Sequence, residues 1–134
     1  MRFLLGWELG SERGHAALIA PVADALRRRG HEVTVALKDC GAWPAGATDI
    51  RLLQAPTWPP PPPPSAEPSS ETLGDDLSSV GLFREGDLLT RARAWRTLIE
   101  DCRADVVLAE TAPTLLLAAR TRCPAIAFGS AYSL

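Results

Sequence analysis

The chain has 134 residues, 46% of them hydrophobic, and a formal net charge of −2 at pH 7. This length predicts one globular domain over residues 1–134, and the near balance of acids and bases gives no electrostatic case for nucleic-acid binding. No apolar run approaches the ~20 residues of a membrane span, and three widely spaced cysteines without a C-x-x-C pair argue against a disulfide framework or a zinc site, so we expect a cytoplasmic protein.

The first half of the chain predicts a strand, a helix and two more strands. Residues 2–7 form a continuous apolar run, which is typical of a strand covered on both faces. The pattern over 14–29 predicts a helix that stops at Gly30, a residue suited to a left-handed helix cap. Further strands are expected over 32–37 and 50–54. The predicted core stripe of the helix consists of Ala17, Leu18, Val22, Ala25 and Leu26.

Residues 55–72 break this pattern with a run of prolines from Pro59 to Pro64. Proline has no backbone N–H and prefers an extended polyproline II path, so this segment is excluded from the sheet. We expect a stiff surface loop inserted within the single domain. The alternative is a docking motif for an SH3-like partner, although no clear flanking basic residue accompanies the prolines.

The second half continues the alternation of helices and strands. A helix is predicted over 86–103, where apolar residues recur at three-and-four spacing, and a strand over 105–109. Pro113 suits the start of a helix over 114–122, and 124–129 predicts a fifth strand. Strands alternating with helices predict an α/β fold, a doubly wound Rossmann-like parallel sheet with helices on both faces.

The turn after the first predicted strand draws attention as a site of chemistry. It runs from Gly10 through Gly14 to His15. A dinucleotide fingerprint G-x-G-x-x-G started at Gly10 would need glycine in place of Glu12 and His15, and a P-loop would need G-K-[ST], so neither motif is present. Ligands of open α/β sheets bind outside the carboxyl ends of the strands, where this turn is predicted to lie. His15 is therefore the first candidate for chemistry.

Several segments of the chain carry a family resemblance. They are Gly14-His15, the run LRRRGHEVT over 26–34, DVVLAE over 105–110, Ala118-Ala119, and CPAIAFG over 123–129. In this order and spacing they resemble the amino-terminal, acceptor-side domain of GT-B-fold, nucleotide-sugar-dependent glycosyltransferases. That family includes the UDP-glucuronosyl and UDP-glucosyl transferases and bacterial natural-product glycosyltransferases. The resemblance covers both ends of the chain and leaves residues 40–85 unmatched.

The resemblance implies a catalytic pair, His15 and Glu110. In the family, the histidine at the position of His15 is the general base that takes the proton from the acceptor hydroxyl, and an acid after the fourth strand orients it. Glu110 stands where the family usually carries aspartate, and its extra methylene moves the carboxylate by ~1.5 Å. The structural alternatives are a histidine that only begins a helix and an acid favoured by the helix dipole.

Substrate-binding residues are predicted around the same turn. Gly10 and Gly14 frame it. Glu8, which ends the first strand, is a candidate for the acceptor cleft, although its position favours a solvated loop acid. Trp7 is predicted to line an apolar acceptor pocket. No carboxylate pair with ligand spacing occurs, so neither a metal nor a resident cofactor is predicted.

In the same family the nucleotide-sugar donor is held mainly by a carboxyl-terminal domain. The resemblance therefore implies part of an inverting glycosyltransferase, truncated after the fifth strand, that binds a small-molecule hydroxyl acceptor. It would meet its donor through a missing domain or a partner chain, and would be inactive alone. The rival interpretation is a non-catalytic, flavodoxin-like module whose turn at Gly10–His15 holds the anion of a nucleotide or effector at a helix N-terminus.

Overall fold

The computed structural model describes residues 1–10, 14–47, 49–57, 72, 74, 75, 78, 82 and 84–129. Most of the proline-rich segment predicted at 55–72 lies outside the described residues, as do residues 11–13 of the first turn. Within the described part the prediction of a doubly wound α/β fold is confirmed.

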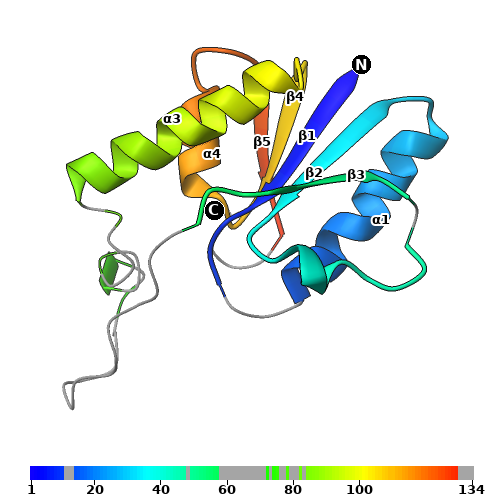
Figure 1. Cartoon of the computed structure of the whole chain (residues 1–134), viewed down its shortest axis with the longest axis horizontal. Helices are drawn as coiled ribbons and strands as arrows, with labels where there is room; N and C mark the ends of the chain where they lie inside the picture. Colours follow the sequence, from blue (N-terminus) through cyan, green and yellow to red (C-terminus); the bar gives the residue numbers. More distant parts are fainter. Residues whose placement is uncertain are drawn as a thin grey trace.

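The sheet forms the centre of this fold. In the described part, five parallel strands lie in the order β3-β2-β1-β4-β5 (Figure 1). The strands are β1 (Arg2–Trp7), β2 (Glu32–Leu37), β3 (Arg51–Gln54), β4 (Val106–Glu110) and β5 (Ala125–Phe128). The five predicted strands are confirmed, although β4 is displaced by one residue so that it ends on Glu110. The strand order changes direction between β1 and β4, the kind of position where open α/β sheets bind ligands.

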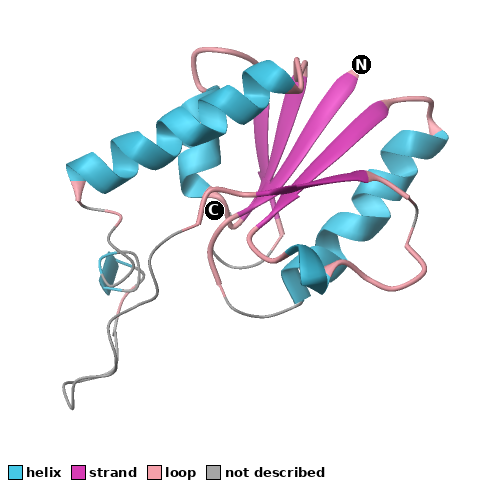
Figure 2. Cartoon of the chain, in the orientation of Figure 1, coloured by secondary structure: helices cyan, strands magenta, loops and turns pink. Residues whose placement is uncertain are grey.

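Helices cover both faces of the sheet. The helix α1 (Gly14–Arg28) lies on one face, and α3 (Glu85–Asp101) and α4 (Pro113–Ala119) lie on the other (Figure 2). A short 3-10 helix, η1 (Cys40–Ala42), follows β2. Pro113 occupies the first turn of α4, as predicted, where its missing N–H costs no hydrogen bond. None of the helices in the described ranges combines the length and the apolarity that a bilayer crossing requires.

The core beneath α3 and α4 is closely packed. Trp95 of α3 and Leu115 of α4 are both fully buried, and both approach Gly6 in the middle strand. A Cβ atom at Gly6 would lie 2.4 Å from Cδ2 of Leu115 and 2.8 Å from Cη2 of Trp95. Glycine at this strand position therefore lets two helices pack directly on the sheet.

The face of α1 that packs on the sheet differs from the predicted stripe. Its buried residues are Ala16, Ile19 and Ala23, whereas Leu18 is 45% exposed. The prediction that placed Ala17 and Leu18 in the core is therefore wrong. Alanines occur all round this helix, so its apolar asymmetry is weak and a rotation by one position changes the pattern little.

The edge strand β5 leaves apolar side chains open to solvent. Ile126 is 54% exposed and lies in register with Leu108 of β4. Both belong to the face on which α1 packs, but α1 lies over β1 and β2. This side of the sheet therefore carries an exposed apolar strip along β5.

Candidate active site

His15 and Glu110 meet at the carboxyl ends of the two central strands. Glu110 is the last residue of β4 and lies in register with Trp7, the last residue of β1. His15 is the second residue of α1, just after the turn that leaves β1. Its Nδ1 atom lies 2.7 Å from Oε2 of Glu110. The Glu110 side chain is fully buried and that of His15 is 13% exposed, so the hydrogen bond is largely shielded from water.

The imidazole of His15 also stacks on the indole of Trp7. The ring centroids are 5.0 Å apart and the ring planes are inclined by 23°. Trp7 is buried, and its indole N–H donates to the backbone carbonyl of Leu9. An aromatic face favours a neighbouring cation, so this contact suits an imidazole that gains a proton. The structure places Trp7 against the candidate base.

Gly10 lies directly against the second nitrogen of the imidazole. Its φ is +87°, and a Cβ atom there would be 2.3 Å from Nε2 of His15. Both the backbone conformation and the space therefore require glycine. Gly14 differs, because a Cβ atom there would meet nothing within 4 Å. Of the two glycines predicted at this site, Gly10 is the one that the geometry of His15 demands.

Two residues that the sequence analysis missed support the Glu110 carboxylate. The hydroxyl of Thr111 donates to Oε1 of Glu110 at 3.0 Å, and Thr111 has a φ of +44°. Gly129, with a φ of +104°, lies so near that a Cβ there would be 2.6 Å from the same oxygen. A glycine directly after the fifth strand was a usable signal for Gly129. Nothing in the sequence marks the unusual backbone of Thr111.

Glu8 lies on the other side of the sheet from His15. Its carboxylate is fully buried, and Oε1 accepts a hydrogen bond from the backbone N–H of Thr114 at 2.8 Å. Oε2 accepts from the Thr114 hydroxyl and from the indole N–H of Trp95. The expectation of a solvated loop acid at Glu8 is therefore wrong. The structure gives this side chain a place between β1, α3 and α4.

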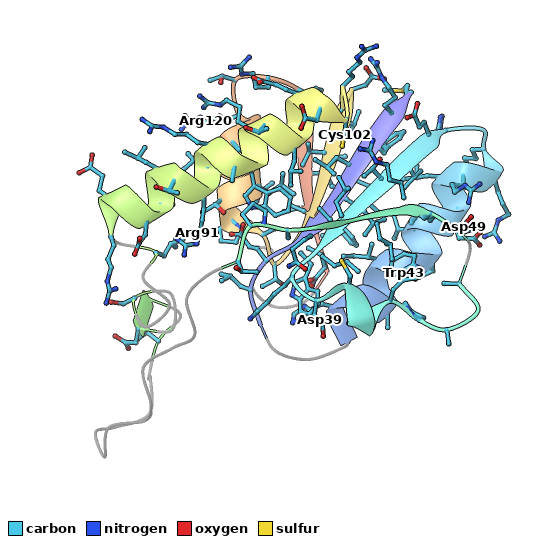
Figure 3. The ribbon with its side chains drawn as sticks, viewed as in Figure 1. Asp39, Trp43, Asp49, Arg91, Cys102 and Arg120 are labelled. Carbon is cyan, nitrogen blue, oxygen red and sulfur yellow. The ribbon has the colours of Figure 1, made fainter. Side chains whose placement is uncertain are left out.

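Residues after β2 complete the surroundings of the turn. The ammonium group of Lys38 donates to the backbone carbonyl of Gly10 at 2.8 Å. Asp39 caps η1 by accepting from the N–H of Gly41 at 2.8 Å, and Figure 3 shows it at the end of the sheet that η1 occupies. Lys38, which the sequence analysis also missed, thus fixes the backbone that faces the imidazole.

The arrangement around His15 can perform proton transfer. A carboxylate bonded to Nδ1 fixes the neutral tautomer with its proton on that nitrogen and leaves Nε2 as the acceptor. Among the described residues, Nε2 has no hydrogen-bond partner. The same carboxylate stabilises the imidazolium that forms when Nε2 takes a proton. These are the requirements of a general base.

The three cysteines do not supply an activated nucleophile. Burial raises the pKa of the thiols of Cys40, Cys102 and Cys123, which keeps each of them protonated. Over the described ranges, no cluster of three or more His, Cys, Asp or Glu side chains is arranged to hold a metal ion.

The chain was compared with known proteins, and it shares its fold with several solved structures. No protein-family model and no curated protein matches the chain. Among solved structures it is similar to the glycosyltransferase SsfS6 from Streptomyces sp. SF2575, at 23% identity with a TM-score of 0.59, over 95% of this chain and 38% of that one. A UGT transferase from Siraitia grosvenorii in complex with UDP gives 18% identity and a TM-score of 0.57, over 96% and 28% of the two chains.

A third similar structure is not a glycosyltransferase. It is the UDP-GlcNAc 2-epimerase from Neisseria meningitidis bound to UDP-GlcNAc, at 15% identity and a TM-score of 0.52, over 96% of this chain and 31% of that one. The chain thus spans about a third of the length of the solved structures it matches. At these identities the likeness establishes the fold, and the chain is a Rossmann-like domain of the kind found in GT-B glycosyltransferases.

Proposed function

We propose that this chain is the acceptor-side part of an inverting glycosyltransferase that moves a sugar from a nucleotide-sugar donor to the hydroxyl group of a small molecule. The observation that carries the proposal is the hydrogen bond between Nδ1 of His15 and Oε2 of Glu110 at the carboxyl ends of the central strands. In this role His15 is the general base and Glu110 orients it. The fold shared with solved glycosyltransferases supports the same conclusion.

The reaction would proceed as one displacement. Nε2 of His15 takes the hydroxyl proton of the acceptor, and the oxygen forms a bond to the anomeric carbon of the sugar. The bond from that carbon to the nucleoside diphosphate breaks, and the diphosphate leaves with the electron pair. Attack from the face opposite the leaving group inverts the anomeric configuration. Glu110 stabilises the imidazolium while the charge develops.

Gly10 and Gly14 are the substrate-facing positions in this proposal. Gly10 lies beside Nε2, the atom that the acceptor hydroxyl must reach, and a Cβ atom at Gly14 would meet nothing within 4 Å. Trp7 and Glu8 are buried, so we assign them to the support of the site. The donor would be bound by further polypeptide, because the similar solved structures are about three times as long as this chain. The chain alone is then expected to be inactive.

The test is His15→Ala in the complete protein, with the donor-binding part present. We expect turnover to fall by about 10²- to 10⁴-fold, the contribution of a positioned base, while nucleotide-sugar affinity is retained. His31→Ala is the matched control, because His31 packs on Phe3 near the start of β1, away from the site. Full turnover by His15→Ala would refute the proposal.

The epimerase that shares this fold suggests a second candidate function. An epimerase would convert the nucleotide sugar without any acceptor, whereas the proposed transferase requires one. Incubating the complete protein with the nucleotide sugar alone separates the two. A non-catalytic binding module would bind the nucleotide and convert nothing in either experiment.

A further inference from the structure

We infer that Glu8 is a positioning residue for the catalytic pair, acting through the turn that joins β4 to α4. The inference rests on the proposed function, because it assigns Glu8 a role in holding His15 and Glu110 in register. The carboxylate of Glu8 joins the end of β1 to Thr114 in the first turn of α4 and to Trp95 of α3.

The end of β1 sends consecutive side chains to opposite helix layers. Trp7 points to the face of α1 and stacks on His15, while Glu8 points to the face of α3 and α4. This alternation is the normal period of a strand. A shift in the end of β1 would therefore reach both layers at once, and the bonds of Glu8 fix this end against α4.

A carboxylate is a costly choice for this position. A buried ionised group needs its oxygens satisfied by strong donors, and an apolar side chain of similar size would avoid that cost. Here both oxygens are satisfied by three donors from two helices. Two of these donors belong to Thr114, so the bonds specify where α4 begins as well as stabilise it.

A continuous path of contacts leads from Thr114 to the imidazole. The turn between Glu110 and Thr114 includes Thr111, whose φ of +44° is rarely adopted by a β-branched residue. The carbonyl of Thr111 accepts from the N–H of Leu9 at 3.1 Å. Its hydroxyl donates to Oε1 of Glu110, whose Oε2 meets His15. Strain of this kind persists only where the surroundings hold it, and here Glu8 and Leu9 hold both ends of the turn.

The first experiment observes the imidazole directly. In the full chain labelled with ¹⁵N-histidine, at about pH 8.5 where an ordinary imidazole is neutral, we expect a protected Nδ1–H signal from His15. Glu8→Leu is expected to abolish that signal and to populate the tautomer with its proton on Nε2. His31 supplies an internal reference in the same spectrum. Ile99→Ala is the matched control, because it creates a cavity in the same core on α3 and the apolar side chain of Ile99 can make no hydrogen bond in the path to Glu110.

Two further variants keep the inference falsifiable. Thr114→Val removes the hydroxyl that donates to Glu8, and it supplies the test if Glu8→Leu fails to fold. Glu8→Gln preserves the shape of the side chain, and we expect it to retain part of the His15 Nδ1–H signal that Glu8→Leu abolishes. In the complete protein we expect Thr114→Val to lower kcat by roughly 2- to 30-fold, the range for residues that act through others, with little change in the KM of either substrate.

The outcomes separate this inference from the proposed function. An unchanged His15 signal in folded Glu8→Leu, or in Thr114→Val, would reduce Glu8 to a helix cap and overturn the inference, while the His15→Ala result could still stand. Equal loss of the signal in Ile99→Ala would also overturn it, because general loosening of the core would then be sufficient. Loss of the signal in the Glu8 and Thr114 variants alone supports it.

Discussion

Nδ1 of His15 and Oε2 of Glu110 are 2.7 Å apart although 95 positions separate the two residues in the chain. The sheet order accounts for this contact. β1 and β4 are neighbours and parallel, so the turns that follow them emerge side by side, one leading into α1 and the other into α4. The long reach of glutamate is accommodated, because its side chain is buried and both oxygens are engaged.

Shortening this acid should break the pair. Glu110→Asp withdraws the carboxylate by ~1.5 Å, one carbon–carbon bond, from both His15 and Thr111. We expect kcat of the complete protein to fall by up to about 10²-fold, the low end of what a positioned base contributes. The measurement is steady-state turnover at saturating substrate. Glu100→Asp, on the exposed surface of α3, is the control and should be neutral. Unchanged turnover in Glu110→Asp would show that Glu110 does not orient the base.

The two glycines of the first turn should respond differently to alanine. Gly10→Ala places a Cβ against Nε2 of His15 at a φ of +87°, so we expect a loss of about 1–3 kcal/mol in the free energy of unfolding. Gly14→Ala meets no neighbour in the first turn of α1 and should be neutral or stabilising by up to about 1 kcal/mol. Urea denaturation of both variants checks the contrast. Similar values for the two would contradict the role given to Gly10.

The contact of Gly6 with α3 and α4 should appear as coupling between substitutions. Gly6→Ala overpacks the core against Leu115 and Trp95, and we expect it to cost about 1–3 kcal/mol. Leu115→Ala alone should cost about 2–5 kcal/mol through the cavity that it leaves. The double variant should lose less unfolding free energy than the two single variants lose together, because the new methyl group fills part of that cavity. Strict additivity, measured by denaturant unfolding, would contradict this packing.

Acid should weaken the ion pair at the opposite end of β1. A hydrogen bond from the Arg2 side chain, with a second from its backbone N–H, lowers the pKa of Asp105 to about 2. Because an unfolded aspartate has a pKa of about 3.9, this group adds stability fully above that value and loses it as the pH falls toward 2. The stability difference between the unmodified chain and Asp105→Asn should therefore be constant above about pH 5 and shrink below about pH 4.

Thermal midpoints across this pH range provide the measurement. Arg2→Met removes the guanidinium but keeps the backbone N–H that donates to Asp105, so it should flatten the acid dependence in part, whereas Asp105→Asn removes the contribution of this carboxylate completely. A difference that persists unchanged down to pH 2 would show that the Arg2–Asp105 contact does not set the acid response.

The parallel sheet could be predicted from the sequence because its strands are continuous apolar runs separated by helix signals. The five strands of the described part follow those runs closely. The side of α1 that faces the sheet could not be predicted, because Ala16, Ala17 and Ala20 give nearly equal hydrophobicity in several directions. Which side packs is decided by contact with β1 and β2 in the folded sheet, and the residue pattern within α1 does not specify that contact.

The site could be predicted only in part. The position of His15 followed from the rule that chemistry gathers at the carboxyl ends of strands, but its pairing with Glu110 came from a family resemblance. The burial of Glu8 was not predictable, because a charged residue at the end of a strand is normally predicted to be exposed to solvent. Trp95 and Thr114, which surround it, are distant in the sequence. The backbone of Thr111 is likewise set by its neighbours in space.

The connection between Gln54 and Glu85 starts at an edge strand, β3, two strands away from β1. At that end the side chain of Gln54 donates to the backbone carbonyl of Lys38, whose ammonium group donates to the carbonyl of Gly10. The entropic cost of closing a loop rises only with the logarithm of its length, by roughly 0.6 kcal/mol for each doubling. Related chains can therefore gain or lose residues in this connection at little thermodynamic expense, and it is the part of the domain where insertions would accumulate while the strands that hold His15 and Glu110 keep their spacing.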